Sequence, residues 1–168
     1  MGMMKKISIA LVALVFSAVA AAEGKVVVFN MQAAIIQTDA AKKSLLALDA
    51  DAEFSQMKAK FEGLRSDLMS LDKNAKTNGM TWSNEQKVDH RKKVEYKSAD
   101  LKLAAEKLKA ERNAVVKKIM QELGPKAKAA LNEVVTAEGL GLVLDSSVAY
   151  WANASYDITA KVTAKLNK

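Results

Sequence analysis

The spacing of apolar and polar positions predicts a long amphipathic helix in the first half of the chain. Apolar residues recur at steps of three and four through residues 54–75, and no proline and only Gly63 interrupt the helical character from about Ala40 to about Ala75. Such a heptad seam is typical of a helix that packs against a partner helix along its length. The seam consists of Phe54, Met57, Phe61, Leu64, Leu68, Leu71 and Ala75.

A second amphipathic helix is expected to cover this seam. Asn78 and Gly79 suit the end of the first helix, because both accept the left-handed conformation that often follows a helix. Ser83, with Gln86 three residues later, forms a capping box that predicts the start of the second helix. Its apolar positions include Val88, Val94, Leu101, Ala105, Leu108, Val115 and Ile119, and Arg112 dilutes them. Together the two helices predict an antiparallel hairpin of about 50 Å.

Strand-like segments lie near both ends of the chain. Residues 25–29 and 141–145 are apolar runs that predict buried strands, and residues 148–151 are a candidate further strand. Asn30 can cap a short helix over residues 31–36, and Thr38 or Asp39 can cap the helix that follows. Asp157 can cap a last helix that carries Ile158, Val162 and Leu166 on one face.

The second helix of the hairpin is expected to be interrupted or kinked at Gly124-Pro125, to resume over residues 126–137 and to close at Glu138-Gly139. We therefore predict an α+β fold in which a small β-body, formed by residues 23–38 and 124–168, carries a projecting helical hairpin arm, residues 39–123. Two or three short strands are marginally stable alone. Oligomerisation would complete the sheet between chains and protect its edges.

The first 22 residues have the layout of a secretory signal peptide. Lys5 and Lys6 precede an apolar stretch over residues 7–16, and small residues lead up to Ala22, where we expect cleavage. The sequence has no cysteine, which excludes disulfides, thiol catalysis and a lipid-modified cysteine. We therefore expect an exported periplasmic protein.

Positive charge is concentrated in the middle of the chain. Residues 58–118 contain sixteen Lys or Arg and nine Asp or Glu, a net charge of +7. One interpretation is a solvated helix face. The other is an electrostatic attractor for acidic partners, anionic lipid head groups or glycolipid phosphates. Nucleic acid is not an expected partner, because export separates the chain from it and no motif with interleaved aromatics is present.

The sequence contains no recognisable catalytic constellation. His90 is the only histidine, and it lies among charged residues at 89–93, so we expect it to be solvated. A single histidine does not make a metal site. The serines lack a base partner, and no spacing of Asp or Glu residues indicates a catalytic carboxylate pair. We therefore expect neither an enzyme nor a cofactor or metal.

Three segments, together with the signal peptide and the basic hairpin, resemble the Skp (OmpH) family of periplasmic chaperones. They are KVVVFNMQAAI from Lys25, GLGLVLDSSVAYWA from Gly139 and YDITAKVTAKLNK from Tyr156. The resemblance implies a homotrimer in which strands from three subunits form a central body and three helical arms surround a cavity. It also implies that unfolded outer-membrane proteins are held in this cavity without ATP before membrane insertion. The family is further associated with anionic lipid and lipopolysaccharide.

Two groups of residues are candidates for interaction. The trimer interface or body is expected to contain Val26, Val27, Val28, Phe29, Leu142, Val143 and Leu144. The candidates for client contact are Met57, Met69, Met80, Trp82, Arg91, Lys92 and Lys93. The heptad seam itself is assigned mainly to packing within the hairpin. For Trp82, at the expected tip of the hairpin, both partner contact and folding back over the helix ends stay open.

A structural coiled-coil adaptor of the cell envelope is the alternative function. An adaptor needs a continuous apolar seam for a fixed partner, whereas a holdase tolerates a broken seam and a mobile arm. The diluted second helix and Gly63 favour the holdase. A third class, binding of lipid or nucleic acid through the basic arm, predicts a steep loss of affinity with salt.

Overall fold

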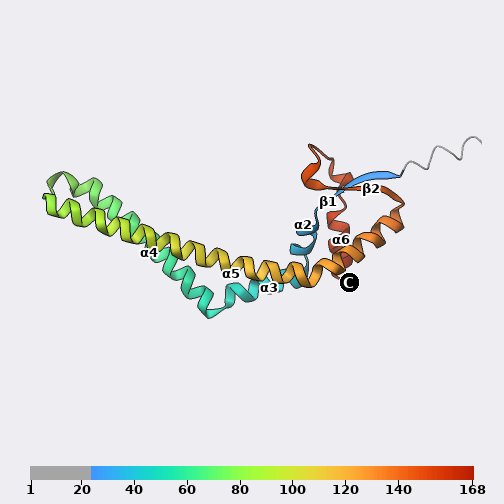
Figure 1. Cartoon of the computed structure of the whole chain (residues 1–168), viewed down its shortest axis with the longest axis horizontal. Helices are drawn as coiled ribbons and strands as arrows, with labels where there is room; N and C mark the ends of the chain where they lie inside the picture. Colours follow the sequence, from blue (N-terminus) through green and yellow to red (C-terminus); the bar gives the residue numbers. More distant parts are fainter. Residues whose placement is uncertain (1–23) are drawn as a thin grey trace, which may run out of the picture. The chain divides into compact units, whose positions relative to one another are not determined.

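A computed structural model describes residues 24–168 (Figure 1), so the predicted signal peptide, residues 1–22, lies outside the described part. The elements are β1 (Lys25–Phe29), α2 (Met31–Ile36), α3 (Asp39–Ala50), α4 (Ala52–Asn78), the 3-10 turn η1 (Gly79–Thr81), α5 (Asn84–Glu138), β2 (Leu140–Asp145), the 3-10 turns η2 (Ser146–Val148) and η3 (Ala154–Tyr156), and α6 (Thr159–Leu166). They form two compact units. The first combines the described residues up to Thr38 with Leu123–Lys168, and the second is Asp39–Glu122.

The first unit is built on a two-stranded parallel sheet. β1 pairs with β2 in a register that sets Val26 opposite Leu142 and Phe29 opposite Asp145. The strand segments from the two ends of the chain therefore meet, as the sequence predicts. Helices α2 and α6 and the last part of α5 cover one face of this sheet. The buried core comprises Val27, Phe29, Ala34, Ala130, Val134, Leu140, Ile158 and Val162.

Two positions in this unit favour glycine, one because of its backbone conformation and the other because there is no room for a side chain. Gly139 follows α5 with φ of 60°, a left-handed conformation that closes the helix at Glu138, as predicted. At Gly141 the backbones of the two strands approach each other closely. A Cβ atom added there would lie 2.7 Å from the Cα atom of Gly24. A side chain at position 141 would therefore push the start of the sheet apart.

Two side-chain caps predicted from the sequence are present in the first unit, and one is displaced. Asn30 Oδ1 accepts a hydrogen bond of 2.8 Å from the backbone N–H of Ala33 at the start of α2. Asp157 Oδ1 accepts one of 2.8 Å from the N–H of Thr159. Ile158, however, is the residue that occupies the N-cap position of α6. Asp157 therefore caps this helix from one position further upstream.

The predicted strand over residues 148–151 is wrong. Residues 146–148 form the turn η2, and residues 149–153 have no regular structure. The carboxylate of Asp145 accepts hydrogen bonds from the N–H and the hydroxyl of Ser147, at 2.8 and 2.6 Å. These bonds turn the chain immediately after β2, so the following residues leave the sheet.

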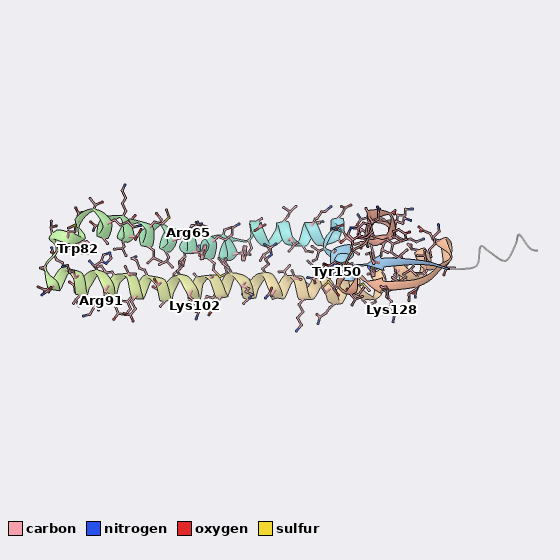
Figure 2. The ribbon with its side chains drawn as sticks, turned by 90° about the horizontal axis from the view of Figure 1, so that it is seen from above. Arg65, Trp82, Arg91, Lys102, Lys128 and Tyr150 are labelled. Atoms are coloured by element: carbon pink, nitrogen blue, oxygen red, sulfur yellow. The ribbon has the colours of Figure 1, made fainter. Side chains whose placement is uncertain are left out.

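In the second unit, α4 and α5 run side by side as a helical hairpin (Figures 1 and 2). Phe54 is buried, and the other six residues of the heptad seam are half-buried. The register on α5 differs at one position from the prediction, because Ala104 is buried and the predicted Ala105 is exposed. Each helix thus covers the apolar side of the other.

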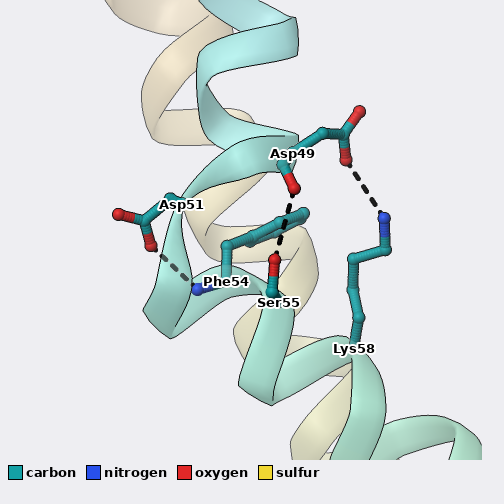
Figure 3. Close-up of polar contacts among 5 residues, drawn as sticks. All are labelled: Asp49, Asp51, Phe54, Ser55 and Lys58. Atoms are coloured by element: carbon teal, nitrogen blue, oxygen red, sulfur yellow. Dashed lines mark hydrogen bonds and ion pairs between the residues drawn. The ribbon is translucent and has the colours of Figure 1, made fainter.

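The first helix of the arm is not continuous, which corrects the prediction. α3 ends at Ala50 and α4 begins at Ala52, with Asp51 in an extended conformation between them (φ −65°, ψ 134°). Asp51 Oδ1 accepts a 2.9 Å hydrogen bond from the N–H of Phe54, and Lys58 Nζ lies 3.2 Å from Asp49 Oδ1 (Figure 3). The carboxylate replaces a backbone acceptor at the new helix start and so stabilises the break.

The second helix was expected to be interrupted or kinked at Gly124-Pro125, and it is not interrupted there, because α5 runs through Pro125 to Glu138. A proline in a helix interior removes one hydrogen bond, but burial of the following turns can compensate for that loss. Ala127, Ala130 and Val134, which follow it, are all buried.

Candidate functional site

The tip of the hairpin is a folded turn. Ser83 N–H donates to Gln86 Oε1 at 2.8 Å, and Gln86 N–H donates to Ser83 Oγ at 3.2 Å, which confirms the predicted capping box. α4 ends at Asn78 as predicted, but Gly79 has φ of −60° and continues into η1 instead of adopting the left-handed conformation.

Trp82 lies in this turn (Figure 2) and folds back onto α5. Its ring centroid is 4.7 Å from that of His90, and His90 Nε2 is 3.0 Å from the carbonyl oxygen of Leu71 on α4. Trp82 and His90 are both half-buried, so the expectation that His90 is solvated is wrong. Of the two interpretations of Trp82, the structure supports the one in which it packs over the helix ends. Met80 beside it is 97% exposed.

The remaining candidates for client contact do not form one cluster. Met57 is half-buried in the seam, whereas Met69 on α4 is 66% exposed. Arg91, Lys92 and Lys93 are exposed on the first turns of α5, and within residues 24–168 none of them forms an ion pair.

The seven residues predicted for the trimer interface lie on two faces of the sheet. Val27 and Phe29 belong to the core of the first unit, and Val143 packs against it. Val26 and Leu142 are exposed at 46% and 49%. Val28 and Leu144, with Val26, line a cavity of ≈ 460 Å³ that is also bordered by Trp151 and Tyr156.

Three exposed aromatic residues near this cavity were not among the contact or interface residues predicted from the sequence. Tyr150 is fully exposed, Trp151 is 78% exposed and Tyr156 is 53% exposed (Figure 2 labels Tyr150). The adjacent aromatic residues Tyr150 and Trp151 could have indicated a contact surface in the sequence, because large aromatics outside regular structure often contact a partner. They were not interpreted in this way because residues 148–151 were predicted to form a strand.

Three further observations concern metal-ligating groups, titration and hydropathy in the described residues. Within residues 24–168, no three His, Cys, Asp or Glu side chains are grouped so that they could hold a metal ion. The hydrogen bonds from Ser147 hold the pKa of the Asp145 carboxyl below its ordinary value. Among the same residues, no helix is sufficiently long and apolar to cross a membrane.

The family model for outer membrane protein (OmpH-like) matches residues 25–166, nearly the whole described chain. The chain therefore belongs to the OmpH-like family. A Skp-like protein from Pseudomonas aeruginosa is 26% identical over 147 residues, which cover 88% of this chain and 86% of that protein. A crystal structure of an OmpH-like protein from Caulobacter crescentus, a proposed outer membrane chaperone, covers 84% of this chain and 83% of its own, with 20% identity and a TM-score of 0.46.

Proposed function

We propose that this protein is an ATP-independent periplasmic holdase that binds unfolded outer-membrane proteins and prevents their aggregation before membrane insertion. In this proposal the signal peptide is removed near Ala22. Residues 23–38 and 124–168 form a trimerisation body, and residues 39–123 form an arm. Membership of the OmpH-like family supports this proposal. An unfolded barrel protein exposes alternating apolar residues and therefore aggregates readily.

The observation that carries the proposal is the surface of the arm. The segment with a net charge of +7 also exposes large apolar side chains, among them Met69 at 66%, Met80 at 97% and Tyr96 at 71%. A promiscuous binder needs such adaptable apolar contacts. A fixed coiled-coil adaptor would instead present a continuous seam, and the seam of this hairpin is covered by its own second helix.

The holdase function is tested by diluting a urea-unfolded outer-membrane protein into buffer and following light scattering. We expect this protein at a few-fold molar excess to suppress the scattering. An unchanged scattering trace would rule out the holdase and leave the adaptor. Capture should also slow as salt is added, because the basic arm would attract acidic clients. An association rate that does not depend on salt would contradict the attraction of clients by the basic arm, but it would not contradict the holdase function.

The homotrimer is supported by the open face of the two-stranded sheet, where Val26 and Leu142 are opposite each other in register and both exposed. We expect Leu142→Asp to dissociate the trimer, because a charge would be buried at the interface. Leu46→Asp, at a position 68% exposed on α3, is the matched control and should leave the assembly intact. Sedimentation equilibrium measures both masses, and a wild-type monomer would contradict the trimer.

A further inference from the structure

The tip of the hairpin contains a chemically reactive pair of residues. Asn78 is the last residue of α4, its side chain is exposed, and Gly79 follows it. No other asparagine in the sequence precedes a glycine. In an Asn-Gly pair the backbone nitrogen of the glycine can attack the side-chain amide carbon of the asparagine, because the glycine has no Cβ atom to obstruct the approach. This reaction converts the asparagine without an enzyme.

The reaction at Asn78 would need only water as a co-reactant. The backbone nitrogen of Gly79 gives up its proton to solvent and forms a bond to Cγ of Asn78. The side-chain nitrogen takes up a proton and leaves as ammonia, so a cyclic succinimide remains. Water then adds to one of the two ring carbonyls and breaks the bond from that carbon to the ring nitrogen. Depending on the carbonyl attacked, the product is an aspartate or an isoaspartate, in which the backbone runs through the former side chain.

The folded tip restrains this reaction. The N–H of Gly79 donates a hydrogen bond to the carbonyl oxygen of Ala75, and it must leave this bond before the nitrogen can act as a nucleophile. The amide that would be attacked is held as well, because Asn78 Nδ2 donates a 2.6 Å hydrogen bond to Asn74 Oδ1. Both bonds lie in the exposed last turn of a helix, and such turns open locally at a low cost in free energy. The reaction is therefore expected to proceed from an open form of the tip.

Both products would weaken the end of α4. An aspartate at position 78 places a negative charge at the C-terminus of the helix, where the helix dipole disfavours it. An isoaspartate adds a carbon to the backbone and so disrupts the spacing that brings the Gly79 N–H to Ala75. The ring of Trp82 lies beside Gly79, since a Cβ atom built on Gly79 would be 3.8 Å from Trp82 Cε3. A change in the backbone at this point would therefore also disturb the packing of Trp82.

We propose that Asn78 is a site of spontaneous deamidation and isomerisation, that opening of the hairpin tip controls its rate, and that the modification loosens the turn that carries Met80 and Trp82. The inference goes beyond the holdase function and does not depend on it. Because ammonia is lost, the modification does not reverse and accumulates with time.

Timed incubation of the full-length protein, followed by digestion with trypsin and mass spectrometry, measures the reaction. Trypsin should release residues 77–87 as one peptide, which contains both Asn78 and Asn84. Asn84 precedes a glutamate and is therefore an internal reference. We expect Asn78 to react at least ~10-fold faster than Asn84, with isoaspartate among the products. The rate should rise with pH, because the Gly79 nitrogen must lose its proton.

The matched variant is Gly79→Ala. Gly79 has φ of −60°, which any residue adopts, and the added Cβ atom would be in ordinary van der Waals contact with Trp82. This variant should keep the fold of the tip, as judged by circular dichroism, and slow the reaction at Asn78 by ~10-fold or more. Ser83→Ala removes the cap at the start of α5 and should instead speed the reaction, because it loosens the same turn. Unfolding the protein in guanidinium chloride should speed it by ~10-fold or more.

Hydrogen exchange tests the effect of the modification on the tip. Asn78→Asp introduces the charge without the isoaspartate, and it should speed exchange of the Gly79 amide by about twofold to fivefold. The isoaspartate form, separated from aged protein, should exchange faster still. Unchanged exchange in both forms would refute the loosening of the tip.

The remaining outcomes decide whether the site exists and whether the fold controls it. If Asn78 reacts no faster than Asn84 in the folded protein, it is not a modification site under native conditions and the inference fails. If Asn78 reacts equally fast in folded and unfolded protein, opening of the tip does not control the reaction, and that part of the inference is overturned.

Discussion

Phe54 is the buried residue of α4 that follows the break in the arm. It lies in the first turn of α4, directly after the cap formed by Asp51, and is 7% exposed in a hairpin two helices thick. Complete burial of a Phe side chain contributes ~1.5–3 kcal/mol. Replacement by Ala in a densely packed core costs about 3–5 kcal/mol. A thin hairpin can close over part of the void. We therefore expect Phe54→Ala to lower the free energy of unfolding by about 2–3 kcal/mol.

Urea unfolding followed by far-ultraviolet circular dichroism measures this loss. Leu46→Ala is the matched control, because Leu46 is an apolar arm residue that is 68% exposed, and we expect its change to stay within about 0.5 kcal/mol. Hydrogen exchange should show faster exchange for the first amides of α4 in Phe54→Ala. A loss below about 1 kcal/mol with unchanged exchange would refute the reasoning, because it would mean that Phe54 is not packed as described.

The other predictions concern two glycines, the cap at the start of α5 and the titration of Asp145. Gly63→Ala should stabilise the arm by about 0.5–1 kcal/mol, because there is space for a methyl group at this position in α4. Gly141→Ala should destabilise the chain, because the added Cβ atom would meet the backbone of Gly24. The thermal unfolding midpoints of the two variants should therefore shift in opposite directions. Ser83→Ala should cost about 1 kcal/mol and speed amide exchange at the start of α5; unchanged exchange would contradict the capping role. Ser147→Ala should raise the pKa of Asp145 toward its ordinary value in an NMR titration, and an unmoved titration would show that these bonds do not set it. Because this pKa is lowered in the folded chain, the stabilisation it provides is present above the ordinary value and is lost as pH falls through the lowered one.

Local patterns predicted the features that depend on neighbouring residues. The capping box at Ser83 and the cap at Asn30 were predictable because the acceptor and the donor are three residues apart. The heptad seam was predictable because its spacing directly sets which side of α4 is apolar. The meeting of β1 with β2 followed from the need of two apolar strands for a partner.

The features that were missed depend on competition between local preference and packing. Asp51 was compatible both with an exposed helical position and with an N-cap, and spacing alone does not distinguish them. Pro125 has a strong local effect, yet the buried turns after it keep α5 continuous. The contact of His90 with Leu71 joins two helices, so the charged neighbours of His90 in sequence gave a misleading expectation of solvation.

Two exposed apolar residues of α5 were also missed. Tyr96 and Leu103 are not among the apolar positions predicted for the second helix. Their exposure, beside the half-buried Leu101, shows that they lie outside the seam. The basic character of the arm could be predicted from composition, whereas the exposure of these two side chains required the structure.

The most direct test of the holdase is to isolate the complex that it should form. A urea-unfolded outer-membrane protein is diluted into buffer with this protein, and the soluble fraction is analysed by size-exclusion chromatography with in-line light scattering. We predict one soluble species whose mass corresponds to a homotrimer with one bound client, formed without ATP. A client that pellets alone, while this protein elutes unchanged, would contradict the account.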